Sequence, residues 1–227
     1  GSREYLNDLC LTFFEQMASV DVHPAVRYNA MLVIASLNTK DPDFRDNAVA
    51  LEAALPVLLK AVQNEQQIDA VKIAALRGIW RHAALGIPNE QNRNAVIQVA
   101  SELAAAKIAT GRTAAGHAWM RRRAIDILGM LGIPGENSET AKLLADIISQ
   151  QSNPPSVRLA ASDALGRLKA TDETQVDTAA TAVGLGKLAL EVCKSFSDEM
   201  QEEVDRRKQE RLLGFAGGTG AMGPGMM

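Results

Sequence analysis

The sequence predicts an all-α fold, a right-handed α-solenoid of about four helix pairs plus a C-terminal capping helix. Three observations predict it. One pattern recurs four times, 47% of residues are hydrophobic but only 4% aromatic, and no stretch alternates with the period of two that marks strands. The four copies open at Val26, Val71, Met120 and Val157, which lie 45, 49 and 37 residues apart. That spacing is typical of two-helix repeats.

Each copy has the same internal pattern. An apolar opener is followed by Arg or Lys, Ala stands four positions after the opener, and small or apolar residues stand seven, eight and eleven positions after it. These offsets share one face of an α-helix. His82 alone breaks the apolar rule at offset eleven. We therefore expect second helices at 26–37, 71–82, 120–131 and 157–168, with this face toward the core.

A further amphipathic segment precedes each copy and is expected to be the first helix of its pair. These segments are 4–19, 47–62, 92–109 and 138–150. Ser138 is a predicted N-cap, because a hydroxyl there can accept a hydrogen bond from the first turn. The first segment places six apolar side chains on one face: Leu6, Leu9, Cys10, Phe13, Phe14 and Met17.

The fourth copy is the most regular. It reads Pro-Ser-Val-Arg-Leu-Ala-Ala from Pro155 and Ala-Leu-Gly-Arg-Leu from Ala164, and the third copy has Ile-Leu-Gly-Met-Leu from Ile127. These motifs resemble HEAT repeats, which belong to the armadillo-like α-solenoids, and the resemblance covers residues 4–169. Armadillo repeats are the near alternative, but their extra short helix has little room here. The resemblance implies a fold and leaves the function open.

Three regions follow from this pattern. Residues 3–170 form the repeats, 171–213 a helical cap, and 214–227 a flexible tail rich in Gly and Met. The cap is expected as one long helix, or two broken at Gly184–Gly186, whose apolar first half covers the last repeat. Its charged second half, from Asp198 to Arg211, is either a solvated face or a partner-binding or dimerising helix. In the tail, Met222, Met226 or Met227 would suit an apolar surface.

Composition narrows the classes of partner. The net charge of −3 and pI of about 5.7 disfavour a general nucleic-acid binder, and no apolar stretch approaches the length of a membrane span. Cys10 and Cys193 lie in apolar helical patterns and are expected to be buried free thiols, which leans toward the cytoplasm. The opening Gly1-Ser2 resembles an expression remnant, so a signal peptide could have been removed and the compartment stays open.

Catalytic and metal-binding patterns are sparse, and neither a cofactor nor a metal is expected. His23, His82 and His117 are far apart and none precedes a Glu, whereas deoxyhypusine hydroxylases of the HEAT type bind iron through repeated His-Glu pairs. The two cysteines lack zinc-ligand spacing. Two alternatives to a non-enzymatic protein stay open: a HEAT-type enzyme such as a bilin lyase, and a nucleic-acid-binding HEAT-like protein.

Binding residues are predicted on the groove side of the second helices, at offsets 2, 6, 9 and 10 from each opener. Trp and Arg are frequent interface anchors. Alternatively, Trp80 packs beneath a neighbouring repeat and the arginines pair with Asp126 and Asp163. Arg121–Arg123 with Arg112 form a basic cluster, expected as a solvated helix start or an anion site. The prediction is a non-enzymatic scaffold or adaptor that binds a protein or peptide through Tyr28, Arg77, Trp80, Arg81, Arg122, Met130 and Arg167.

Overall fold

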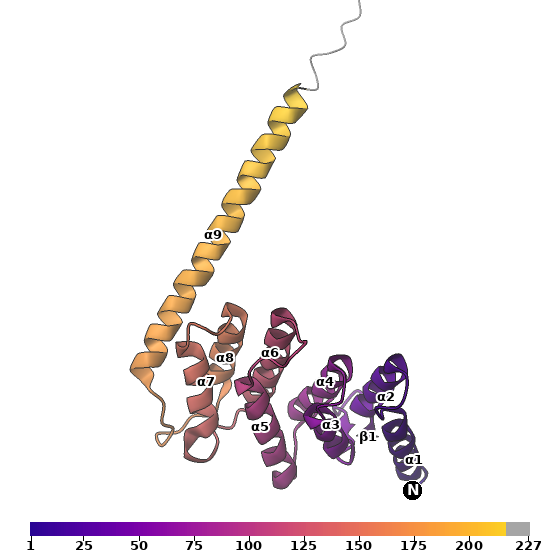
Figure 1. The fold of residues 1–227 in the computed structure, drawn as a ribbon. Helices are drawn as coiled ribbons and strands as arrows, with labels where there is room; N and C mark the ends of the chain where they lie inside the picture. Colours follow the sequence, from indigo (N-terminus) through magenta and orange to yellow (C-terminus); the bar gives the residue numbers. More distant parts are fainter. Residues whose placement is uncertain (217–227) are drawn as a thin grey trace, which may run out of the picture.

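The computed structural model describes residues 1–216, and this part of the chain is almost entirely helical (Figure 1). This confirms the all-α prediction. Nine α-helices, one 3-10 turn (Glu136–Ser138) and one two-stranded hairpin occur in the described range. The helices are α1 (Ser2–Met17), α2 (Pro24–Ser36), α3 (Ala54–Gln63), α4 (Asp69–Leu85), α5 (Glu90–Ala105), α6 (Ala114–Leu131), α7 (Glu139–Ser149), α8 (Pro155–Arg167) and α9 (Thr178–Ala216).

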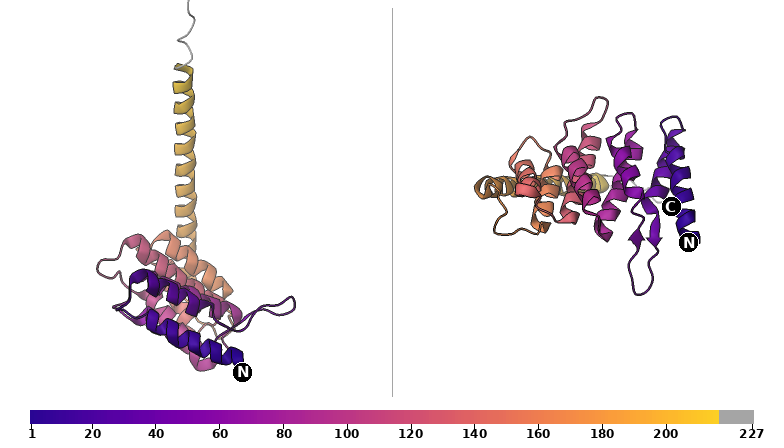
Figure 2. Two further views of the ribbon diagram at one scale, coloured as in Figure 1. Left: turned by 90° about the vertical axis from the view of Figure 1, so that its right-hand side faces the viewer. Right: turned by 90° about the horizontal axis from the view of Figure 1, so that it is seen from below.

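The first eight helices form four pairs that stand side by side in a row (Figures 1 and 2). Within each pair the two helices contact each other, and each second helix (α2, α4, α6, α8) also contacts the next second helix along the row. The first helices α3, α5 and α7 form the opposite layer, where neighbours touch as well. The hydrophobic core is therefore continuous through the row.

The repeat pattern locates the buried face in three of the four copies. Val71, Met120 and Val157 are fully buried. The residues four and eight positions after Val71 and after Met120 are fully buried as well. The first copy departs from the pattern, because its opener Val26 is 43% exposed while the following Arg27 is buried. Arg27 turns inward to donate to the Val20 carbonyl at 3.3 Å and to the Gln67 side chain.

Arg121 and Arg112 are not solvated. Each of them contacts a residue of a neighbouring helix pair. Arg121 donates to the Ala104 carbonyl at 2.7 Å and, across to the fourth pair, to the Asn153 side chain at 2.9 Å. Arg112 pairs with Asp69 of the preceding helix pair at 2.6 Å. The predicted solvated cluster around Arg121–Arg123 is therefore wrong for Arg121 and Arg112, since both are engaged in contacts between pairs.

The fourth copy has the most buried of these arginines. Arg158 is 1% exposed. It donates to the carbonyls of Ile148 at 3.0 Å and Gly184 at 3.1 Å, and to the Glu191 carboxylate at 2.9 Å. Because Gly184 and Glu191 belong to α9, this one side chain joins the last pair to the C-terminal helix.

Three boundaries of the predicted first helices are wrong. Residues 47–50 are not helical: Val49–Ala50 is strand β2, which pairs antiparallel with β1 (Asn38–Lys40). The Leu51 amide donates to the Leu37 carbonyl, which holds the end of β2 beside the first pair, and a turn at Glu52 and Ala53 then leads into α3. Helix α5 begins earlier than expected because the Asn89 side chain accepts from the Asn92 amide, and it ends at Ala105, where Ala106 is extended.

Ser138 stands at the N-cap position of α7 but does not cap it. Its backbone is left-handed, with φ of 64°, and its hydroxyl accepts a hydrogen bond from the Gln175 amide at 2.9 Å. The predicted capping hydrogen bond is therefore replaced by a contact with the segment that leads to α9.

The predicted apolar face of α1 is largely exposed. Leu6, Leu9 and Phe13 each show about half of their surface to solvent, and no residue of α1 is fully buried. Phe14 and Met17 do pack against the core, together with Leu11. The packed side of α1 is thus centred on residues 11, 14 and 17, of which the sequence pattern had included 14 and 17 but not 11.

Helix α9 is one unbroken helix, and most of it projects from the end of the row, on the side of the second helices (Figures 1 and 2). It contacts α7 and α8 at its N-terminal end. Gly184 lets it approach closely, because a Cβ there would lie 2.9 Å from the Ser149 Cα. The prediction that its whole apolar first half caps the last repeat is wrong: Leu188 is buried, but Leu190 and Phe196 are exposed.

Two further expectations concern the cysteines and the C-terminal tail. Cys193 is exposed and Cys10 half-buried, and both thiols are free, so the predicted burial fails for Cys193. Residues 214–216, expected in the tail, belong to α9. The rest of the tail, including Met222, Met226 and Met227, lies outside the described residues.

No helix in the described part of the chain has the length and apolar character to span a bilayer.

Candidate functional site

The seven predicted binding residues all lie on second helices and are called the ridge below. Tyr28 is on α2, Arg77, Trp80 and Arg81 are on α4, Arg122 and Met130 on α6, and Arg167 on α8. Because consecutive second helices contact each other, the ridge runs along one layer of the row. Its members differ in exposure: Arg77, Arg122 and Arg167 are exposed, and Tyr28, Trp80, Arg81 and Met130 are half-buried.

The apolar members of the ridge have two roles at once. Tyr28, Trp80 and Met130 pack against the core, yet each keeps part of its surface open to solvent. Trp80 therefore fits both interpretations in part, since its side chain packs against the core and is still partly exposed. An aromatic side chain held in this way loses little conformational entropy when it is contacted.

Arg81 is turned away from the open surface. Its guanidinium donates to the side chain of Asn38, in the hairpin. Burial lowers the pKa of Arg81, and its Nη1 is buried without a hydrogen-bond partner among the described residues. Arg81 thus joins α4 to the hairpin and contributes little to a binding surface.

A charged cluster covers the ridge where α6 meets α8. Arg167 pairs with Asp163 at 2.5 Å, as the alternative interpretation expected. Asp126, however, lies 3.6 Å from Arg123, not from Arg122. Burial raises the pKa of Asp126, against the opposing effect of Arg123, Arg122 and Arg167.

Sequence reasoning missed Trp119, and it placed Arg123 in a basic cluster without its contacts to Trp119 and Asp126. The Arg123 guanidinium lies 5.3 Å from the centre of the Trp119 ring, which is a cation–π geometry. Their spacing of four residues, with Asp126 three residues further on, would have indicated such contacts on a helix surface.

Two exposed cations of the ridge form no ion pair with a described residue. Within residues 1–216, neither Arg77 nor Arg122 lies within ion-pair distance of a carboxylate, and both are exposed. They stand on adjacent second helices, and Arg77 is three residues from Trp80. The ridge therefore combines two exposed guanidinium groups that form no ion pair in this part of the chain with a partly exposed aromatic ring.

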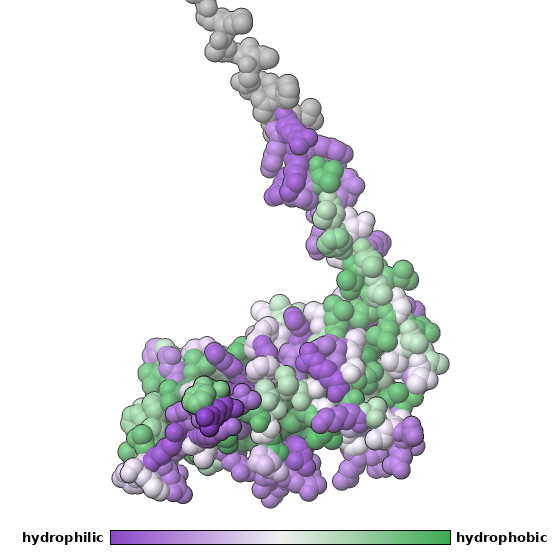
Figure 3. Space-filling model, turned by 180° about the vertical axis from the view of Figure 1, so that it is seen from behind, coloured by the Kyte–Doolittle hydropathy of each residue, from purple (hydrophilic) through white to green (hydrophobic). Residues whose placement is uncertain are grey.

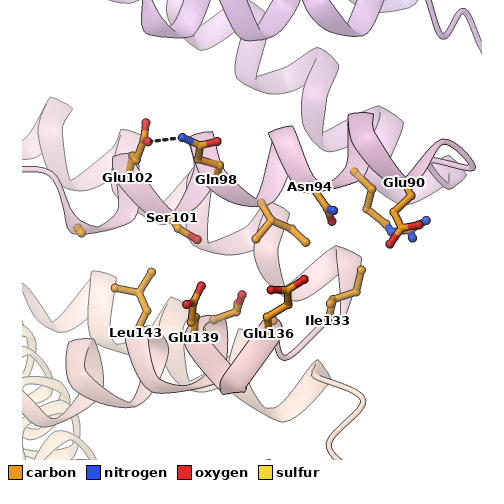
Figure 4. Close-up of a pocket in the computed structure, with 14 residues that line it drawn as sticks. Glu90, Asn94, Gln98, Ser101, Glu102, Ile133, Glu136, Glu139 and Leu143 are labelled. Atoms are coloured by element: carbon orange, nitrogen blue, oxygen red, sulfur yellow. Dashed lines mark hydrogen bonds between the residues drawn. The ribbon is translucent and has the colours of Figure 1, made fainter.

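The opposite layer has a cleft that was not predicted. It lies between α5 and α7, has a volume of about 820 Å³, and is lined by four glutamates and one arginine (Figure 4). Glu136 and Glu139 face Asn94 and Ser101 across the opening, with Ile133 and Leu143 beside them. Ile97 adds to the apolar part of the lining, and Arg93 donates to the Ile87 carbonyl at 3.2 Å. Only the relative placement of two helices creates this cleft, so no local sequence signal marks it.

Histidine and cysteine side chains do not assemble into a site. No group of three His, Cys, Asp or Glu residues in the described range is arranged to hold a metal ion. His82 is 3% exposed on α4, and its Nε2 has no partner among the described residues. Burial lowers the pKa of His82 to about 4, and the charge of Arg81 acts in the same direction.

The buried His82 predicts acid sensitivity. The folded chain keeps the ring neutral until about pH 4, whereas the unfolded chain takes up the proton near pH 6.5. The free energy of unfolding is therefore unaffected by protonation of His82 above pH 6.5, and it decreases as the pH falls to about 4. We expect the wild-type chain to lose on the order of 3 kcal/mol of unfolding free energy between pH 7 and 4 because of His82, and we expect His82→Leu to abolish this loss. Urea unfolding of both proteins across this range measures it, and parallel pH curves would contradict it.

Comparison with known proteins gives no match: no family model, no curated protein and no solved structure is similar to this chain.

Proposed function

We propose that this chain is a non-enzymatic, protein-binding scaffold or adaptor, built as a right-handed α-solenoid of HEAT-like helix pairs. The regular openers, the four helix pairs and the contacts between successive second helices support this assignment. In this arrangement the second helices line the concave side, so the ridge faces a groove.

The two layers of helices are unequally spaced, which supports a row that curves toward the second helices. The second helices approach closely, because Gly129 of α6 lies so near α8 that a Cβ there would be 2.8 Å from the Ala164 Cα. A Cβ on Gly78 would meet Ala35 of α2 at the same distance. In the layer of first helices, by contrast, α5 and α7 leave the 820 Å³ cleft between them. A row that is tighter on one side curves toward that side, which makes the second-helix layer concave.

The observation that carries the functional proposal is that Arg77 and Arg122, on neighbouring second helices, are exposed and form no ion pair within the described range, while Trp80, three residues after Arg77, is partly exposed. Exposed arginines without partners can form bidentate hydrogen bonds with carboxylates, and Trp and Arg dominate binding energy at many interfaces. The partner that fits is a protein segment with two or more acidic side chains and an apolar side chain that contacts Trp80.

Affinity capture with charge-reversed variants tests this proposal. The wild-type chain is compared with Arg77→Glu/Arg122→Glu, which leaves Trp80 and the core intact. A matched control, Arg45→Glu/Lys107→Glu, makes the same change of net charge at exposed positions outside the ridge. We expect the control to recover the proteins that the wild type binds and the ridge variant to recover at least about tenfold less of them. Equal recovery by all three proteins would exclude the ridge as the binding surface.

A further inference from the structure

Helix α9 has two distinct faces. Among its described side chains, Thr181 and Leu188 are buried, and Gly184 between them packs on Ser149. The opposite side of the helix is apolar and open to solvent, with Leu190 74% exposed and Met200 50% exposed. The space-filling view shows this apolar stretch continuing along α9 beyond the helix pairs, before the charged segment begins (Figure 3).

Four exposed apolar residues of α9, Val183, Leu190, Met200 and Val204, fit a seven-residue repeat, whereas Leu185, Val192 and Phe196 fall outside it. Val183, Leu190 and Val204 are separated by multiples of seven, with Ser197 at the remaining position, and Gly186, Cys193 and Met200 form a second series three residues later. We call these seven residues the seam. They correspond to positions a and d of a coiled coil, while Thr181, Gly184 and Leu188 fall at positions f and b on the opposite side. The side of α9 that contacts the helix pairs is thus kept apart from the seam.

We propose that the seam of α9 pairs with the same seam of a second copy of this chain, as a parallel, in-register two-stranded coiled coil. A seven-residue repeat keeps two helices in contact along their length, and 183–204 spans three heptads. The two sets of helix pairs then lie on the outside of the coiled coil, because each contacts its own α9 through the face opposite the seam.

The charges beside the seam favour a parallel second copy over an antiparallel one. The e positions hold Lys187, Lys194, Gln201 and Lys208, whereas the g positions hold Ala182, Ala189, Phe196 and Glu203. In a parallel pair each g position faces the e position five residues later on the other helix, so Glu203 faces the partner's Lys208. An antiparallel pair sets e against e, and therefore lysines against lysines. Charge complementarity thus selects the parallel arrangement.

Cys193 makes the arrangement directly measurable. It is free and exposed in the single chain and occupies a d position in the middle of the seam. In a parallel, in-register pair the two Cys193 side chains face each other, within the separation of roughly 7 Å between Cα atoms that a disulfide requires. Added diamide accepts two electrons and two protons from the two thiols and is reduced to the hydrazine, while the S–S bond forms.

The test uses the full chain with Cys10→Ser, so that Cys193 is the sole thiol. Light scattering after size exclusion gives the mass, and a non-reducing gel after brief diamide treatment gives the fraction of covalent dimer. Leu190→Glu changes the seam, and Leu185→Glu makes the same change at an exposed leucine outside it. Circular dichroism checks that both variants remain helical.

We expect a dimer that crosslinks through Cys193, retained in Leu185→Glu, and at least a tenfold loss of crosslinking together with a monomeric mass in Leu190→Glu. A monomeric parent protein at 200 µM, or a dimer that survives Leu190→Glu, would overturn the proposal. A dimer without the Cys193 crosslink would exclude the parallel register. None of these outcomes depends on what the ridge binds.

Discussion

Replacing Arg158 by methionine is expected to destabilise the fold by about 3 kcal/mol, because it removes the buried charged donor that binds the carbonyls of Ile148 and Gly184. Arg158 is 1% exposed and makes three hydrogen bonds. Methionine fills much of the space of the arginine stem but cannot donate to the carbonyls of Ile148 and Gly184. Urea unfolding measures the loss, and hydrogen exchange should show faster opening at the start of α9.

Arg167→Met is the matched control, because Arg167 lies on the same helix. Its ion pair with Asp163 is exposed on both sides, with 47% and 57% of the two side chains accessible. Exposed ion pairs contribute roughly 0 to 1 kcal/mol, so this variant should unfold at nearly the wild-type urea concentration. If both methionine variants lose the same small amount of stability, Arg158 does not join the last pair to α9.

Gly129→Val is expected to destabilise the chain by about 3 kcal/mol, at the upper end of the cost of overpacking a close contact. A Cβ at Gly129 would lie 2.8 Å from both the Cα and the Cβ of Ala164. The Ala164 backbone cannot yield as a flexible side chain could, so α6 and α8 must separate. Thermal unfolding followed by circular dichroism measures the change.

Gly166 is the natural control for Gly129, since both stand nine positions after an opener. A Cβ at Gly166 meets nothing within 4 Å, because no second helix follows α8 there. Gly166→Val should therefore change the stability by less than about 0.5 kcal/mol, as surface substitutions usually do. Equal destabilisation by the two valines would mean that the cost lies within each helix and not between neighbouring pairs.

The sequence predicted the second helices well because their apolar period is local. Val71, Met120 and Val157 recur with the same buried companions, and that recurrence needs no knowledge of distant contacts. Contacts between distant segments could not be found in this way. Arg158 looks like an ordinary surface arginine until Glu191, 33 residues later, is placed beside it. Val49 pairs with Lys40 in a hairpin, and the Leu51 amide two residues later donates to the Leu37 carbonyl; no helical pattern contains either contact.

The candidate site was predictable to the same extent. The helix offsets placed Arg77 and Arg122 on an exposed layer correctly, because exposure on one helix follows from its period. They failed for Arg81, whose guanidinium is engaged by Asn38, 43 residues away. The cleft between α5 and α7 was missed for the related reason that its volume depends on how far apart two helices stand.

Site-specific photocrosslinking tests the central claim, that a protein partner binds along the ridge, most directly. A photoreactive phenylalanine analogue replaces Tyr28 of α2 in one protein, which keeps an aromatic ring there and leaves both arginines in place, and Gln98 of α5 in another; Tyr28 is half-buried and Gln98 is exposed. The scaffold account predicts that light attaches the captured partner through position 28 and not through position 98. Attachment through position 98 alone would place the partner on the opposite layer and contradict the account.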